Sequence, residues 1–163
     1  MSNIAYEEVF NDHVIKIIYD EYPSNPRDDT YNLGTMAHWH NRYILGEEQI
    51  ENPSELFQKL SGIYFDDLED RYVGNFKSDF KYKGRWYTEE AIKELMEAKA
   101  NREYVILPLY LYDHSGITMS TSPFGDRWDS GQVGWMFISK KKVREEYSVK
   151  RISPKQLELV KGY

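Results

Sequence analysis

The chain has 163 residues, and we expect one domain over residues 1–163. It contains no cysteine, which excludes a disulfide scaffold and any cysteine-ligated zinc or iron–sulfur site. No apolar run approaches the roughly 20 residues of a membrane-spanning helix, and the N-terminus has no basic start followed by an apolar stretch. We therefore expect a soluble, cytoplasmic protein with no membrane partner.

Charge is unevenly distributed along the chain. Residues 1–70 carry fifteen acidic and four basic side chains, a balance of −11, whereas residues 71–163 carry twelve acidic and seventeen basic ones, a balance of +5. An acidic half creates a directed field that attracts basic surfaces and repels phosphates. A negatively charged surface that contacts only solvent would give the same pattern.

The first third of the chain mixes apolar and turn-forming segments. The β-branched segment HVIKIIYD (13–20) indicates a buried strand or the end of a short helix. The prolines and glycine of residues 21–34 indicate a loop. Residues 35–45 fit a helix and a strand equally. Residues 52–62 predict a short helix, with a proline near its start and Gly62 past its end.

The middle of the chain contains the clearest helix. Residues 63–76 are acidic with interleaved aromatic side chains, which favours a helix or a loop. Residues 80–86 alternate aromatic and basic side chains, as a strand does. Residues 87–101 predict a helix with Thr88 as its N-cap and an apolar stripe that includes Ile92.

The last third predicts strands followed by helices. We expect strands at residues 103–113, 117–122 and 132–139, with an edge or a bulge at Pro108 because proline cannot donate to a ladder. Two serines serve as N-caps of the helices near the C-terminus: Ser139 and Ser153.

Together these elements predict an α+β fold, an antiparallel meander flanked by several short helices. Along the chain we distinguish an acidic half at 1–70, a sheet-rich region at 103–139 and C-terminal helices at 140–162.

The stretch DHSGITMSTSPFGDRWDSGQVG (113–134) concentrates polar and turn-forming residues. Two turns explain much of it, one at DHSG and one at SPFGDRWDSG. We expect Gly116 and Gly131 to have positive φ, and Asp113 and Asp129 to bond their own backbone two residues on.

Turns alone do not explain the imidazole, guanidinium and indole groups of this stretch. We therefore keep its polar side chains as candidate functional residues: Asp113, His114, Ser115, Asp126, Asp129 and Ser130. Serine hydrolysis is disfavoured, because the members of a catalytic triad come from separate elements and no G-x-S-x-G motif is present.

A metal site is one alternative. The HWH motif places His38 and His40 at i and i+2, on one face if the segment is a strand. Asp113 and His114, or the two aspartates of the following loop, would complete a set of His and carboxylate ligands. A metal-dependent hydrolase or nucleic-acid-modifying enzyme follows from this alternative. Imidazoles bonded to the backbone are the simpler explanation, and we expect no metal or other cofactor.

Nucleic-acid binding is a third hypothesis. Basic side chains interleave with aromatic ones in FKYKGRWY, and a lysine run precedes a helix. The candidates for a phage DNA-associated protein are Lys81, Lys83, Arg85 and Lys140–Lys142. The net charge of −6 argues against direct binding of nucleic acid.

Protein binding is the explanation we favour. Arg127 and Trp128 carry side chains typical of interface anchors. Two acidic clusters would dock on a basic groove of a partner: Glu47, Glu48, Glu51, Asp66, Asp67, Glu69 and Asp70. Such pairing is fast and sensitive to salt.

Two segments carry a family resemblance. The segments NPRDDTYNLGTMAHWHNRY (25–43) and LPLYLYDHSGITMSTSPFGDRWDSGQVGWMFISKKKVREEY (107–147) resemble a family of small proteins encoded by phages and conjugative elements of Gram-positive bacteria. The resemblance implies an accessory protein of a mobile element and carries no catalytic residue with it. Proteins of that kind often antagonise restriction enzymes or CRISPR nucleases. We therefore expect a non-enzymatic inhibitor that binds a basic, nucleic-acid-binding host-defence protein or nucleoprotein complex.

Overall fold

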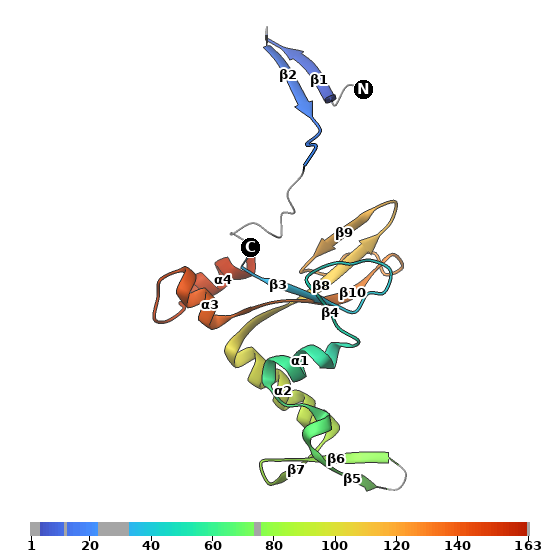
Figure 1. Cartoon of the computed structure of the whole chain (residues 1–163), viewed down its shortest axis with the longest axis vertical. Coiled ribbons are helices and arrows are strands. Elements are labelled where there is room, and N and C mark those ends of the chain that lie inside the picture. Colours follow the sequence, from blue (N-terminus) through green and yellow to red (C-terminus); the bar gives the residue numbers. More distant parts are fainter. Residues whose placement is uncertain (1–3, 12, 23–32, 74–75, 163) are drawn as a thin grey trace. The chain divides into compact units, whose positions relative to one another are not determined.

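A computed structural model describes residues 4–11, 13–22, 33–73 and 76–162. The chain divides into two compact units, Met1–Asn32 and Leu33–Tyr163, where the sequence predicts one domain. Helices and sheets are both present (Figure 1), which confirms the α+β class. Most of the loop predicted at residues 21–34 lies outside the described residues.

The first unit contains a two-stranded hairpin. β1 (Ile4–Phe10) pairs antiparallel with β2 (His13–Ile18), and Val9 lies opposite Val14. The strand predicted at residues 13–20 is confirmed, but its predicted burial is wrong, because every described residue from 5 to 22 is exposed. Among the described residues the unit holds only these two strands, so no further layer of the unit covers them.

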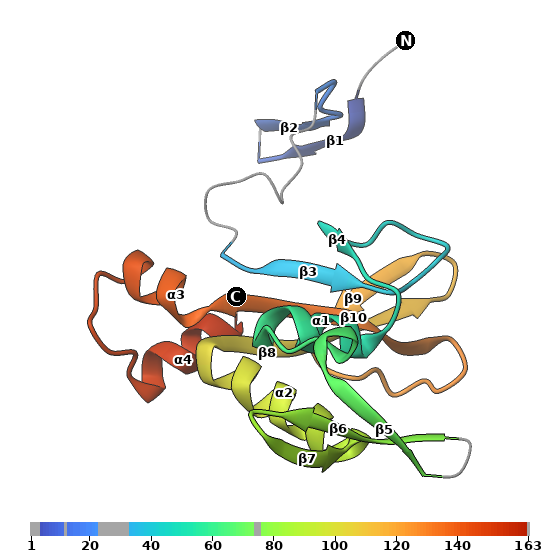
Figure 2. The ribbon, with the colours of Figure 1, turned by 60° about the horizontal axis from the view of Figure 1, so that its bottom comes forward.

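The second unit is built on a five-stranded sheet of order β4-β3-β10-β8-β9 (Figure 2). Its strands are β3 (Thr35–His38), β4 (Glu48–Gln49), β8 (Tyr104–Asp113), β9 (Ile117–Ser120) and β10 (Ser130–Ser139). β10 lies between β8 and β3 rather than beside β9, so the strand order departs from a simple meander. The connection over residues 121–129 carries the chain past Tyr112 of β8, whose ring lies 5.5 Å from that of Phe124.

Pro108 lies where β8 is paired on one side only. It is opposite Trp135 of β10, whereas β9 pairs with β8 only from Tyr110 to Asp113. The register of β10 also shifts between Gln132 and Gly134. The expected edge is therefore present at the proline, and the bulge lies in β10 opposite Leu109 and Tyr110.

The predicted helices and their caps are confirmed. The helices are α1 (Pro53–Ser61), α2 (Glu89–Glu103), α3 (Lys140–Glu146) and α4 (Pro154–Gly162). Gly62 ends α1 in the left-handed conformation, with φ of 62°. Side-chain oxygens of Thr88 and Ser139 accept backbone N–H groups of α2 and α3. Ser153 and Gln156 form the capping box of α4.

Residues 63–76 differ from the prediction. They form a 3-10 turn, η2 (Phe65–Asp67), followed by a strand, β5 (Glu69–Val73). β5 pairs with β6 (Phe76–Tyr82), which pairs with β7 (Arg85–Thr88) to give a three-stranded sheet. Glu69 and Asp70 lie on opposite faces of this strand, a period of two that the sequence did not separate from a helix or a loop.

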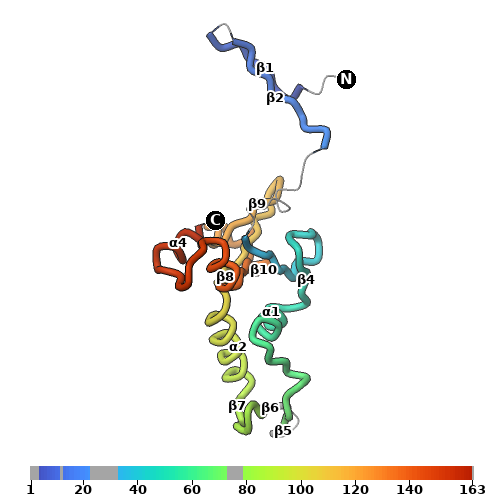
Figure 3. Tube along the Cα trace, turned by 60° about the vertical axis from the view of Figure 1, so that its left-hand side comes forward, coloured from blue at the N-terminus to red at the C-terminus, as the bar shows by residue number. Residues whose placement is uncertain are grey.

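Helices cover one face of the five-stranded sheet beside its centre. Ala37 and Phe137 pack on Leu56 of α1, which is fully buried. α1 runs alongside α2 (Figure 3), and α2 packs its Ile92 and Met96 into the same layer.

The opposite face is covered in two parts. Val105 and Ile138 pack against Val143 of α3 and Val160 of α4. Farther along the same face, Leu45 of the loop 39–47 covers strand residues of β8 and β10. This loop is therefore part of the core as well as of the surface.

Candidate functional site

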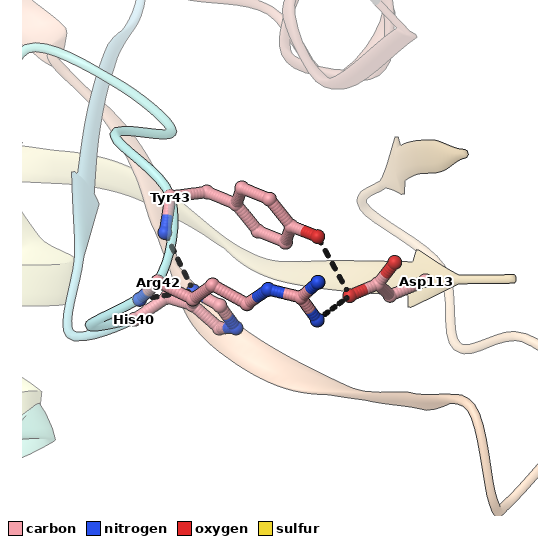
Figure 4. A network of polar contacts seen from close by, with 4 residues as sticks. All are labelled: His40, Arg42, Tyr43 and Asp113. Carbon is pink, nitrogen blue, oxygen red and sulfur yellow. Dashed lines mark hydrogen bonds and ion pairs between the residues drawn. The ribbon is translucent and has the colours of Figure 1, made fainter. Parts of the chain in front are cut away.

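Three connections meet at one end of the five-stranded sheet, which we call the loop end. They are the loop 39–47, the β8–β9 turn 114–116 and the loop 121–129. Asp113, the last residue of β8, joins the first two, because its Oδ2 accepts hydrogen bonds from Tyr43 Oη at 3.0 Å and Arg42 Nη1 at 3.2 Å (Figure 4). Residues some 70 positions apart are thus held together by a charge-assisted bond.

His40 holds the loop 39–47 from within. Its Nδ1 accepts the backbone N–H groups of Arg42 and Tyr43, each at 3.2 Å, and its ring stacks on Tyr43 with centroids 5.3 Å apart. The guanidinium group of Arg42 lies over the ring of Tyr43, 5.0 Å from the ring centre. Desolvation and the bond to Asp113 raise the pKa of Tyr43, and the nearby Arg42 charge partly offsets the rise.

Asp129 and Asp126 brace the third connection. Asp129 Oδ2 lies 2.8 Å from His114 Nδ1, and its carbonyl accepts the N–H of Asp113 at 2.8 Å. Asp126 accepts the N–H groups of Trp128 at 2.7 Å and Asp129 at 3.2 Å. These backbone bonds stabilise the carboxylate and lower the pKa of Asp126.

The turn chemistry predicted for this stretch is wrong in detail. Asp126, not Asp113 or Asp129, bonds the backbone two residues on, because Asp113 is held by Tyr43 and Arg42. Neither Gly116 nor Gly131 has positive φ; Ser115 takes that conformation, at 58°. The Ser130 hydroxyl donates to the Asp126 carbonyl and closes the loop.

The loop end presents large side chains to solvent. Trp128 is 96% exposed and Ile44 is 91% exposed, and Arg127 is exposed beside the indole. Sequence reasoning found Arg127 and Trp128 but missed residues 42–44, although Arg42 and Tyr43 end the motif NPRDDTYNLGTMAHWHNRY and Ile44 follows it directly. Arg42 and Tyr43 are held in place by their contact with Asp113, which no local pattern reveals.

The four residues proposed for a metal site are not brought together as ligands. β3 ends at His38, which is 1% exposed beneath the loop 39–47, where its Nε2 accepts the N–H of Leu45 at 3.3 Å. His40 uses Nδ1 for backbone bonds, and Asp113 is engaged with Tyr43 and Arg42. Within the described ranges, no three His, Asp or Glu side chains form a cluster that could hold a metal ion.

The acidic candidates are spread over several strands, turns and loops, and several contact the chain itself. Glu48, on β4, pairs with Lys59 at 2.6 Å, and Glu69, on β5, pairs with Lys81 at 2.7 Å. Glu47 accepts the N–H of Met36 at 2.7 Å. Asp70 is half-buried, whereas Glu51, Asp66 and Asp67 are exposed, as are Glu47 and Glu69. The acidic cluster is therefore smaller than the sequence suggests.

The lysine run at the start of α3 is partly used for structure. Lys140 Nζ donates to the carbonyls of Asn101 and Arg102, and Lys142 Nζ donates to the carbonyl of Leu33. Lys141 lies 3.7 Å from Glu145 on the helix surface.

No family model, curated protein or solved structure matches this chain. The family resemblance of residues 25–43 and 107–147 therefore stays a prediction. In the part of the chain that the structure describes, no helix has the length and apolar composition needed to cross a membrane.

Proposed function

We propose that the chain is an accessory protein of a phage or conjugative element that acts in the bacterial cytoplasm as an anti-restriction or anti-CRISPR inhibitor. It binds a host-defence protein or nucleoprotein complex and blocks it without catalysis. The resemblance of the two motif segments supports the target class. The observation that carries the binding role is the exposed Trp128.

Trp128 supports a binding role because a large indole stands in water on a loop that is held in place. Asp126 fixes the backbone of the indole residue itself, and Asp129 ties the loop to His114. A pre-organised aromatic anchor loses little conformational entropy when a partner buries it. Two further side chains are exposed at the loop end, Arg127 next to Trp128 in the chain and Ile44 on the loop 39–47.

The exposed carboxylates support a basic partner. Asp66 and Asp67 are exposed on η2, and Glu51 is exposed before α1. A nucleic-acid-binding protein offers a complementary positive surface. Binding that uses these groups weakens as the salt concentration rises.

The proposal is tested by expressing the chain in bacteria that carry a restriction or CRISPR system and plating a sensitive phage. The wild-type chain should raise plating efficiency, and the double variant Arg127→Ala/Trp128→Ala should lose that effect while melting normally. Tyr22→Ala is the matched control, because Tyr22 is 89% exposed in the other unit. Full protection by the double variant, or none by the wild type in either system, would contradict the proposal.

One contact favours an enzyme as the second candidate. A carboxylate 2.8 Å from Nδ1 orients the imidazole of His114, as in general-base catalysis, and the side chain is 63% exposed. His114→Gln keeps a donor toward Asp129 but cannot act as a base. In the plating assay it should retain protection if the chain acts by binding and lose it if the chain acts as an enzyme.

A further inference from the structure

A hollow lies between the β6–β7 hairpin and α2, away from the loop end. Cross-strand pairing puts Tyr82 opposite Arg85 on the hairpin face that also carries Tyr87. Opposite them, α2 contributes one helical face with side chains at i, i+3, i+4 and i+7: Leu95, Ala98, Lys99 and Arg102. The hollow has a volume of about 740 Å³.

Four cations and no carboxylate line this hollow. They are Lys83, Arg85, Lys99 and Arg102. In the described part of the chain none of the four forms an ion pair, although Lys83 lies 5.4 Å from the Tyr82 ring centre. Cations gathered without counter-charges repel one another, so an anion that binds among them relieves the repulsion.

The other face of the three-stranded sheet β5-β6-β7 shows the contrast. There Arg71 pairs with Asp79, and Lys81 pairs with Glu69 at 2.7 Å. Both cations also lie near the ring of Trp86, at 4.7 and 5.6 Å. Basic side chains are thus neutralised on one face of this sheet, whereas no carboxylate lines the hollow on the other face.

A second basic hollow lies near the C-terminal end of α2, where Arg102 lines the first one. Its volume is about 670 Å³, and its cations are Lys140, Arg144, Lys150 and Arg151. Lys140 Nζ donates to the carbonyl of Asn101 at 2.7 Å and to that of Arg102 at 3.1 Å. Because Arg102 lines the first hollow, the two hollows flank the last turn of α2.

We propose that these two hollows bind the phosphate backbone of a single-stranded nucleic acid. Eight cations on both sides of one helix turn suit a ligand with several regularly spaced phosphates. Tyrosines in the first hollow offer surfaces on which bases or sugars can pack. Stacking on these rings requires unpaired bases, which a single strand offers and a duplex does not.

The test measures fluorescence anisotropy of labelled oligo-dT, oligo-U and a DNA duplex of equal length with the full chain. We expect the single strands to bind more tightly than the duplex. The variant Lys99→Ala/Arg102→Ala should bind oligo-dT about tenfold more weakly, and the slope of log affinity against log salt should fall by about 0.7 for each phosphate contact removed.

Two controls separate this site from general charge. Lys59→Ala/Lys161→Ala removes two lysines that are ion-paired with Glu48 and Glu158, and it should leave the affinity unchanged. The charge-preserving variant Lys99→Arg/Arg102→Lys should retain most binding. Equal loss in the Lys59 and Lys99 double variants, or tighter binding of the duplex, would overturn the proposal.

This inference does not rest on the proposed function. The variant Arg127→Ala/Trp128→Ala should bind oligo-dT like the wild type, and Lys99→Ala/Arg102→Ala should keep the loop end intact. Loss of phage protection and loss of oligonucleotide binding therefore report on different surfaces.

Discussion

Gly134 shows what one missing side chain does in this fold. A Cβ at this position would lie 2.3 Å from the Ala37 carbonyl oxygen and 3.0 Å from His38 Cα, both backbone atoms of β3. Gly134→Ala must therefore push β3 away from β10, and we expect it to lower the free energy of unfolding by about 1–3 kcal/mol or more. Urea denaturation measures the change.

Gly131 is the matched control in the same strand. A Cβ there meets no atom within 4 Å, and its φ is not positive. Gly131→Ala should change stability by no more than about 0.5 kcal/mol. Equal stability of the two variants would contradict the close approach of β3 to β10.

Asp126 gives the loop end a pH dependence of known sign. Its pKa is lowered from the ordinary 3.8 by backbone N–H groups, so its contribution is complete above that value and is lost as pH falls through the folded pKa. With fluorotryptophan labelling, we expect the Trp128 NMR signal to stay constant from neutral pH to about pH 4 and to shift below it.

Substitutions at Asp126 separate charge from hydrogen bonding. Asp126→Ala removes the acceptor and should shift the Trp128 signal already at neutral pH, whereas Asp126→Asn keeps an acceptor oxygen without the titration. Trp128→Phe assigns the signal among the four tryptophans. A wild-type signal that titrates near neutral pH would assign the transition to another group.

Local residues were predictable and distant partners were not. Thr88, Ser139 and Ser153 were found as caps because capping is decided within a few residues. Asp113 was assigned to a turn, whereas it bonds Tyr43, which precedes it by 70 positions. That contact requires β10 to lie between β3 and β8, and no spacing in the sequence encodes this order.

At the scale of elements, the β1–β2 hairpin is the least protected part of the described chain. Hairpins of two strands are marginally stable in water, and the apolar side chains of this one are exposed, including Val9, Phe10 and Ile17. We expect amides of residues 4–18 to exchange with deuterium at rates near those of an unstructured chain. Amides of β8 and β10, which pair at the centre of the other unit, should exchange far more slowly.

Protection of the hairpin amides equal to that of the β10 amides would show that another surface covers the hairpin.

The sequence predicted burial of the hairpin because β-branched apolar residues are typical of buried strands. Composition shows that a strand has apolar side chains to bury, but it does not show which surface covers them. The described residues of this unit supply no further layer. The same limit explains residues 63–76, where the choice among helix, loop and strand depended on pairing with β6.

At the scale of the molecule, the net charge conceals its distribution between the two units. Residues 1–32 carry seven acidic and two basic side chains, a balance of −5 within the total of −6. Residues 33–163 are therefore close to neutral, and eight of their cations line two hollows. The net charge of −6 argued against nucleic-acid binding because it adds together the charges of two units that the sequence did not separate.

Deletion of residues 1–32 tests this view. Every buried hydrophobic residue of the described chain lies at position 37 or beyond, so the shortened chain should keep its melting temperature. Removing a balance of −5 should strengthen oligo-dT binding at low salt, because the field that repels phosphates becomes weaker. At high salt the Debye length shortens, to about 3 Å at 1 M, so the two chains should bind oligo-dT with equal affinity. Unchanged affinity at low salt would mean that the N-terminal charges act beyond the reach of the basic hollows, and a lower melting temperature would mean that the two units share a core.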